Sequence, residues 1–136
     1  MKYIVFAFMV IFSLVGCAPV TESSLRQEAA GVRTFTIEQP YQQVFQNLLD
    51  SSRQCFLNRP IETQFTVVGN RNNRVKSGEI VIAEIWSMAE RNVFMLVDVE
   101  AVSNGESRIT SYHSSRKAEE FVKLLGDWIS QGKSAC

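Results

Sequence analysis

The sequence predicts a small α+β protein in which an antiparallel five-stranded sheet carries two helices on one face. Three observations lead to this prediction. Five segments alternate apolar and polar residues as a strand does, two segments repeat apolar residues as a helix does, and Asn104-Gly105 marks a tight hairpin between the last two strands. The expected order is strand, helix, four strands in a meander and a final helix.

The first strand is expected over residues 34–38, where Phe35 and Ile37 alternate with polar residues and point inward. Pro40 then suits the start of a helix. From there the apolar side chains recur at helical spacing, at Tyr41, Val44, Phe45, Leu48, Leu49, Cys55 and Phe56. This is the clearest helix in the sequence.

Three strands are expected next, over residues 61–68, 76–86 and 93–102, with a polar turn over residues 69–74. Gly78 suits a bulge or the start of its strand. The centre of that strand, residues 80–83, is continuously apolar, which indicates that both of its faces are covered.

The last strand and the last helix complete the order. The strand is expected over residues 107–113, and Ser114 or Ser115 can cap a helix that Gly132 ends. The apolar face of this helix consists of Ala118, Phe121, Val122, Leu125, Trp128 and Ile129.

Strict alternation in the strand over residues 93–102 predicts a candidate partner surface. Val93, Met95, Val97, Val99 and Ala101 would share the core face of this strand. Phe94 and Leu96 would then lie on the polar face with Asp98 and Glu100, exposed unless something covers them.

The amino terminus resembles a bacterial lipoprotein signal peptide. Lys2 supplies a positive charge, residues 3–15 are apolar apart from Ser13, and Leu14-Val15-Gly16-Cys17 has the form of a lipobox. The apolar run is shorter than the roughly 20 residues of a membrane span. An uncleaved anchoring helix and ordinary secretory cleavage are the alternatives.

The resemblance implies that Cys17 carries the lipid as the first residue of the mature chain. Ala18 stands where an aspartate would signal retention in the inner membrane. The resemblance therefore implies a location in the outer membrane, facing the periplasm. The expected organisation is therefore a signal peptide over residues 1–16, a flexible polar tether over residues 17–33 and one domain over residues 34–136.

The chain has three cysteines, and assigning Cys17 to the lipid leaves Cys55 and Cys136. In an oxidising compartment a disulfide between them is the simplest interpretation. Its loop of about 80 residues would contribute roughly 4 kcal/mol in the chain-entropy model. The alternative is two unrelated thiols.

The charges are balanced, because removal of Lys2 from the 14 basic residues leaves 13 against 14 acidic ones. This balance gives no reason to expect nucleic acid or an anionic membrane surface as a partner. Arg71, Arg74 and Lys76 are the densest positive patch. They either contact an acidic partner or belong to an ordinary solvated hairpin.

The sequence indicates no catalytic set and no cofactor. His113 is the only histidine, too few for a usual zinc site, and a lone histidine at a strand end is typical of a polar surface position. We therefore expect no enzymatic activity, no catalytic residue and no metal site.

The aromatic residues either fill a core or line a cavity for an apolar ligand. They are Phe35, Tyr41, Phe45, Phe65, Trp86, Phe94, Phe121 and Trp128. The two alternatives predict different functions.

The element order from Thr34 onward is similar to the helix-grip and TBP-like arrangement, which is also seen in BamC-type domains of outer-membrane lipoproteins. That resemblance implies a fold and no activity. The expected function is that of a non-enzymatic outer-membrane lipoprotein whose periplasmic domain binds another cell-envelope component. The expected partner is an envelope protein, with no nucleic acid. The alternative functions are a carrier or sensor of a small apolar ligand and, third, a hydrolase.

Overall fold

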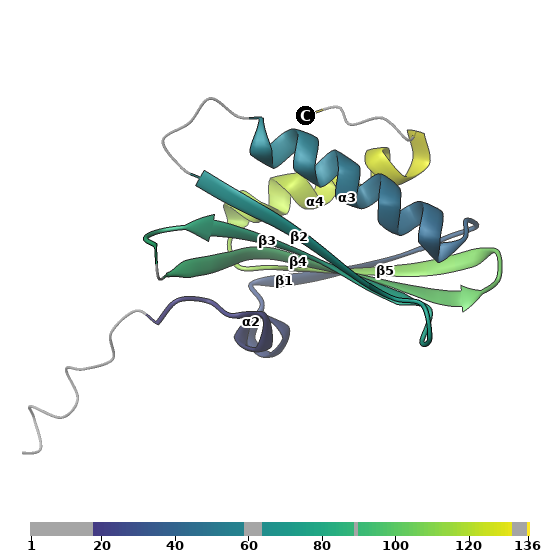
Figure 1. The fold of residues 1–136 in the computed structure, drawn as a ribbon, viewed down its shortest axis with the longest axis horizontal. Helices are drawn as coiled ribbons and strands as arrows, with labels where there is room; N and C mark the ends of the chain where they lie inside the picture. The colour runs from purple at the N-terminus through teal and green to yellow at the C-terminus, as the bar shows by residue number, and fades with distance from the viewer. Residues whose placement is uncertain (1–17, 59–63, 89, 132–135) are drawn as a thin grey trace, which may run out of the picture.

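One sheet forms the centre of the molecule, with helices on both of its faces (Figure 1). The computed structural model describes residues 18–58, 64–88, 90–131 and 136. The strands are β1 (Gly31–Ile37), β2 (Gln64–Asn72), β3 (Ser77–Ile85), β4 (Arg91–Ser103) and β5 (Glu106–His113). They lie in the order β1-β5-β4-β3-β2, and each neighbouring pair is antiparallel. The predicted α+β class with a five-stranded antiparallel sheet is therefore confirmed.

Helices α3 (Tyr41–Leu57) and α4 (Arg116–Gln131) pack side by side on one face of the sheet (Figure 1). Pro40 precedes the first residue of α3, and the hydroxyl of Ser115 accepts a hydrogen bond from the Ala118 amide at 3.4 Å at the start of α4. Both helices bury the apolar stripes that the sequence predicts. The predicted end of α4 at Gly132 lies outside the described residues.

The prediction of a flexible tether over residues 17–33 is wrong for residues 18–33, the part that the structure describes. Residues Glu22–Glu28 form helix α2, on the face of the sheet opposite to α3 and α4 (Figure 1). Thr21 and Ser24 cap its start reciprocally. Leu25, only 1% exposed, packs on Val81, Val93 and Leu96, so an apolar patch on the sheet stabilises a helix that would not be stable alone.

Strand β1 also begins earlier than expected, at Gly31 rather than Thr34. Its first residue pairs with His113, the last residue of β5. A Cβ atom at residue 31 would collide with the His113 ring, so only glycine fits this close approach. Phe35 and Ile37 face the core, as predicted.

The expected exposure of Phe94 and Leu96 is wrong. For Phe94 the reason is a β-bulge that interrupts the alternation of β4. Ile82 pairs with Met95 and Ala83 pairs with Val93, which leaves Phe94 as the extra residue. Phe94 is therefore 3% exposed in the main core beside Met95. Leu96 lies on the opposite face, but α2 covers it and its exposure is 0%. Neither side chain can contact a partner.

The hairpin between β2 and β3 is tighter than the predicted turn over residues 69–74. Strand β2 continues to Asn72, which pairs with Ser77. Gly69 and Gly78 lie within the two strands, where added Cβ atoms would press on Leu49 and on the Phe45 ring of α3. The start of the strand predicted over residues 61–68 lies partly outside the described residues. The Asn104-Gly105 hairpin is confirmed, since β4 ends at Ser103 and β5 begins at Glu106.

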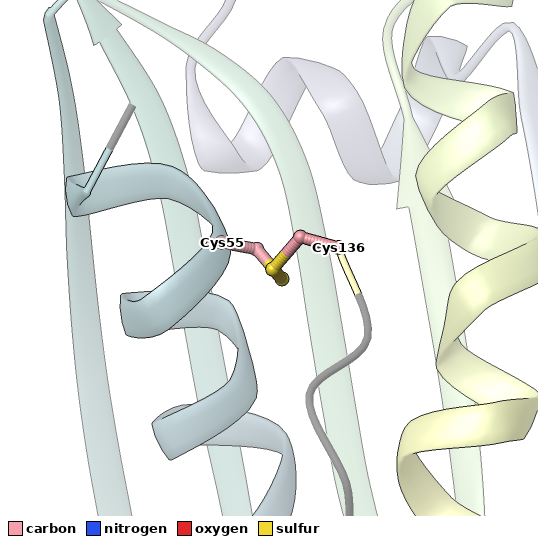
Figure 2. The surroundings of a disulfide bond; sticks show 2 residues. All are labelled: Cys55 and Cys136. Carbon is pink, nitrogen blue, oxygen red and sulfur yellow. A yellow bond between two sulfur atoms is a disulfide. The ribbon is translucent and has the colours of Figure 1, made fainter. Parts of the chain in front are cut away.

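The predicted disulfide is present between Cys55 of α3 and Cys136 (Figure 2). The two Cα atoms are 5.5 Å apart, within the usual range for a disulfide, and 81 positions separate the residues in the sequence. The bridge fastens Cys136 to the C-terminal part of α3. Within the described ranges, no helix has both the length and the apolar character needed to cross a bilayer.

Candidate functional site

A polar groove is open on the α2 face of the sheet, beside the C-terminal end of α2. Its volume is about 450 Å³. Residues of α2, β2, β3 and β4 line it, namely Arg26, Asn70, Arg71, Asn72, Ser77, Gly78, Glu79, Asp98 and Glu100. The groove therefore offers amide, hydroxyl, guanidinium and carboxylate groups to a ligand, and no large apolar side chain.

Arg26 forms one wall of the polar groove and also joins α2 to the sheet. Its guanidinium pairs with Asp98 in a fork, with Nη2 2.9 Å from Oδ1, and lies 2.5 Å from Oε2 of Glu79. It also lies over the Tyr112 ring, 5.4 Å from the centroid. Hydrogen bonding to Asp98 raises the pKa of Arg26 above its ordinary value. Asp98 therefore has a structural partner and is not a free carboxylate.

Glu100 follows Asp98 by two residues on β4, and its carboxylate is 3.9 Å from the Arg108 guanidinium. Both side chains are more than half exposed, so this ion pair is weak. Glu100 remains accessible to a cationic or hydrogen-bonding group in the groove.

The predicted positive patch divides in the structure. Arg71 lies on β2 and lines the polar groove, whereas Arg74 and Lys76 lie in the hairpin that follows. The side-chain oxygen of Asn72 accepts from the Arg74 amide at 3.1 Å, which closes the turn. Lys76 has a φ of 50° and its ammonium lies 3.5 Å from the side-chain oxygen of Asn104. Of the three, only Arg71 is among the residues that line the groove, and its pairing with Gly78 directs its side chain toward the α3 face of the sheet.

His113 is buried rather than at the polar surface, so that expectation is wrong. It is 4% exposed, and its Nδ1 has no hydrogen-bond partner among the described residues. Burial lowers the pKa of His113, with a smaller opposing effect from Glu119 and a lowering effect from Arg33. The ring is consequently neutral at neutral pH and packs closely over Gly31.

The layer between the sheet and α3 and α4 is filled by aromatic side chains. Phe56, Phe65, Phe94 and Phe121 form a cluster whose neighbouring ring centroids are 4.6 to 5.9 Å apart. A pocket between β1 and α4 has about 190 Å³, below the roughly 300 to 1,000 Å³ of ordinary ligand sites. The aromatic residues of this layer build a core. Trp86 lies outside the layer and is exposed in the β3–β4 turn.

No group of three or more metal-ligating side chains occurs within the described part of the chain. The polar groove was missed by sequence reasoning, because its walls come from four elements that only the register of the sheet and the docking of α2 bring together. Asp98 and Glu100 were visible as charged residues, but nothing local placed Arg26 or Glu79 beside them.

Together the fold and the groove define a small α+β domain with a filled core and an open polar groove. No protein-family model matches the chain, and no curated protein matches it. Among solved structures, the crystal structure of Ara h 8.0201 is similar at 13% sequence identity, over 75% of this chain and 94% of that chain, with a TM-score of 0.33. A likeness this distant carries no argument about function.

Proposed function

We propose that this protein is a lipoprotein, anchored through Cys17 in the outer membrane and facing the periplasm, whose non-enzymatic domain binds another cell-envelope component through the polar groove. The lipobox supports the anchor. The observation that supports the binding role is the position of the groove at the end of the sheet opposite to the N-terminal segment.

This position follows from the pairing of β3 with its neighbours. Ser77, at the groove end of β3, pairs with Asn72, and Ile85, at the other end, pairs with Gln64. The nine residues of β3 span roughly 30 Å. The N-terminal segment is hydrogen-bonded to the start of β4, beside the Ile85 end. An anchor at Cys17 would therefore leave the groove directed away from the bilayer.

The chemistry of the groove favours a polar segment of a protein partner. Its walls supply several hydrogen-bond donors and acceptors and both signs of charge, which is typical of a protein interface outside its apolar centre. Asn70 is the side chain that we use to probe the groove, because its pairing with Glu79, which in turn pairs with Asp98, places it on the groove face of the sheet. The alternative, a carrier or sensor of a small apolar ligand, has less support because the aromatic cluster fills the sheet–helix layer.

The anchor is tested by metabolic labelling with a clickable fatty acid. Wild-type protein should incorporate the label, and Cys17→Ser should lose it because the acceptor sulfur is gone. Labelled protein is detected in a gel after affinity purification, with total protein as the loading control. Equal labelling of the two chains would rule out lipidation at Cys17.

The binding role is tested by photo-crosslinking in intact cells. A photoreactive amino acid replaces Asn70 in the groove or, as the matched control, Arg53 on the exposed side of α3. A discrete crosslinked product is expected from residue 70 and not from residue 53, and mass spectrometry identifies it. The same products from both positions, or none from residue 70, would contradict a partner in the groove.

A further inference from the structure

The turn between β3 and β4 presents three apolar side chains to solvent. Ile85, Trp86 and Met88, here called the apolar tip, are 36%, 55% and 108% exposed. The turn is closed, because the amides of Trp86 and Ser87 donate to the carbonyl of Glu90 at 3.0 and 3.2 Å. A tryptophan and a methionine that are both more than half exposed, two positions apart, indicate a contact surface.

The N-terminal segment is fastened to the same end of the sheet. The Val20 amide donates to the side-chain oxygen of Asn92, and the Val93 amide donates to the Val20 carbonyl, both at 2.8 Å. Glu22 forms an ion pair with Arg91, the first residue of β4. In Figure 1 the start of the described chain accordingly lies on the same side as the β3–β4 turn.

The length of chain between this point and the anchor is short. Cys17 precedes Val20 by three residues, so their Cα atoms can be no more than about 11 Å apart. An acyl chain on Cys17 would lie in the bilayer, and the apolar tip would then be within reach of the headgroups. We infer that the apolar tip inserts into the bilayer interface beside Cys17. This inference rests on the lipid anchor of the proposed function.

The chemistry of the apolar tip suits this location. Tryptophan is enriched at the interface of membranes, where the ring is buried and its N–H can remain hydrated. The ring nitrogen of Trp86 lies 3.2 Å from a carboxylate oxygen of Glu84. Glu84 and Glu90 give the turn no cationic character, and Arg91 is already paired with Glu22. Insertion therefore depends on apolar burial and not on anionic lipid.

Insertion would fix the orientation of the domain. The acyl chains and the apolar tip are two separate attachments, and two attachments restrict rotation of the body in a way that one flexible attachment does not. The strands of β3 and β4 then lead away from the bilayer, and the polar groove lies at their far end.

The test uses the fluorescence of the two tryptophans. The full chain, purified from membranes, is reconstituted into phosphatidylcholine vesicles with and without a lipid that carries a quencher near its headgroup. Trp86 emission should shift to shorter wavelength and be quenched, whereas the buried Trp128 should not respond. Trp86→Phe should remove the quenched component and keep the Trp128 emission, which reports an intact fold.

A tryptophan at the other end of the sheet is the matched control. Val75 is 63% exposed in the β2–β3 hairpin, so Val75→Trp in the Trp86→Phe background should give an unquenched signal. Replacing part of the phosphatidylcholine by phosphatidylglycerol should not increase quenching of Trp86. Quenching of residues 75 and 86 alike would overturn a specific orientation.

A second arm separates this inference from the lipid anchor. The chain from Cys17 onward is coupled through the Cys17 thiol to a maleimide phospholipid in the same vesicles, whatever the cell does to that residue. If the purified full chain does not have the added mass of acyl groups, the proposed anchor is refuted. Quenching of Trp86 in the coupled protein would still test insertion of the apolar tip. If Trp86 stays unquenched in the coupled protein, insertion of the apolar tip is overturned. The same result is expected if the tip contacts a protein and not the bilayer.

Discussion

Replacing Cys136 by serine is expected to lower the free energy of unfolding by about 4 to 5 kcal/mol. The disulfide joins residues 81 positions apart, so it removes much of the conformational freedom of the unfolded chain. Such a loss is a large part of the roughly 5 to 15 kcal/mol by which a domain is usually stable. Urea unfolding followed by circular dichroism at equilibrium measures the change.

The design of this experiment depends on which cysteine is changed. Cys136 is exposed, whereas Cys55 is 2% exposed in the core, so Cys136→Ser removes the bridge with less disturbance of packing. Both wild-type and variant chains carry Cys17→Ser to prevent thiol exchange. Reduction of the Cys17→Ser chain should reproduce the loss caused by Cys136→Ser. Equal unfolding midpoints with and without the bridge would contradict its role.

The second large effect is expected from Leu25→Ala. Truncation of a fully buried leucine usually costs about 2 to 5 kcal/mol, and Leu25 is the buried residue of α2. A seven-residue helix does not persist without packing, so α2 should detach from the sheet and expose Val81, Val93 and Leu96. Hydrogen exchange should show loss of protection at the α2 amides, and a dye that binds apolar surface should bind the variant.

Ser23→Ala is the matched control for this prediction. Ser23 is an exposed residue of the same helix, and alanine there slightly favours helix formation. Its α2 amides should keep wild-type protection. Full protection of α2 in Leu25→Ala would show that the ion pairs of Arg26 and Glu22 hold the helix without the leucine.

The sequence predicted the elements whose pattern is local. The stripe of α3 and the alternation around Phe35 need only neighbouring residues to be recognised. Helix α2 was missed because it contains one buried residue, and the patch that receives Leu25 is assembled from β3 and β4, far along the chain. Its docking is a property of the folded sheet.

The bulge at Phe94 was missed for a different reason. Alternation assigns faces correctly only while no extra residue is inserted, and composition does not give the position of an insertion. A signal was nevertheless present: residues 93–97 are continuously apolar, as residues 80–83 are. Such a run indicates cover on both faces, which would have placed Leu96 beneath another element.

The order of the strands leaves β1 and β2 as the two edges of the sheet. Open edges can recruit strands from other copies, a hazard that increases if anchored copies are confined to one membrane. The outer edges here carry Arg33 on β1 and Arg71 on β2, with threonine and asparagine beside them. Charged and polar side chains on an edge strand oppose edge-to-edge association, so these residues favour separate copies of the domain.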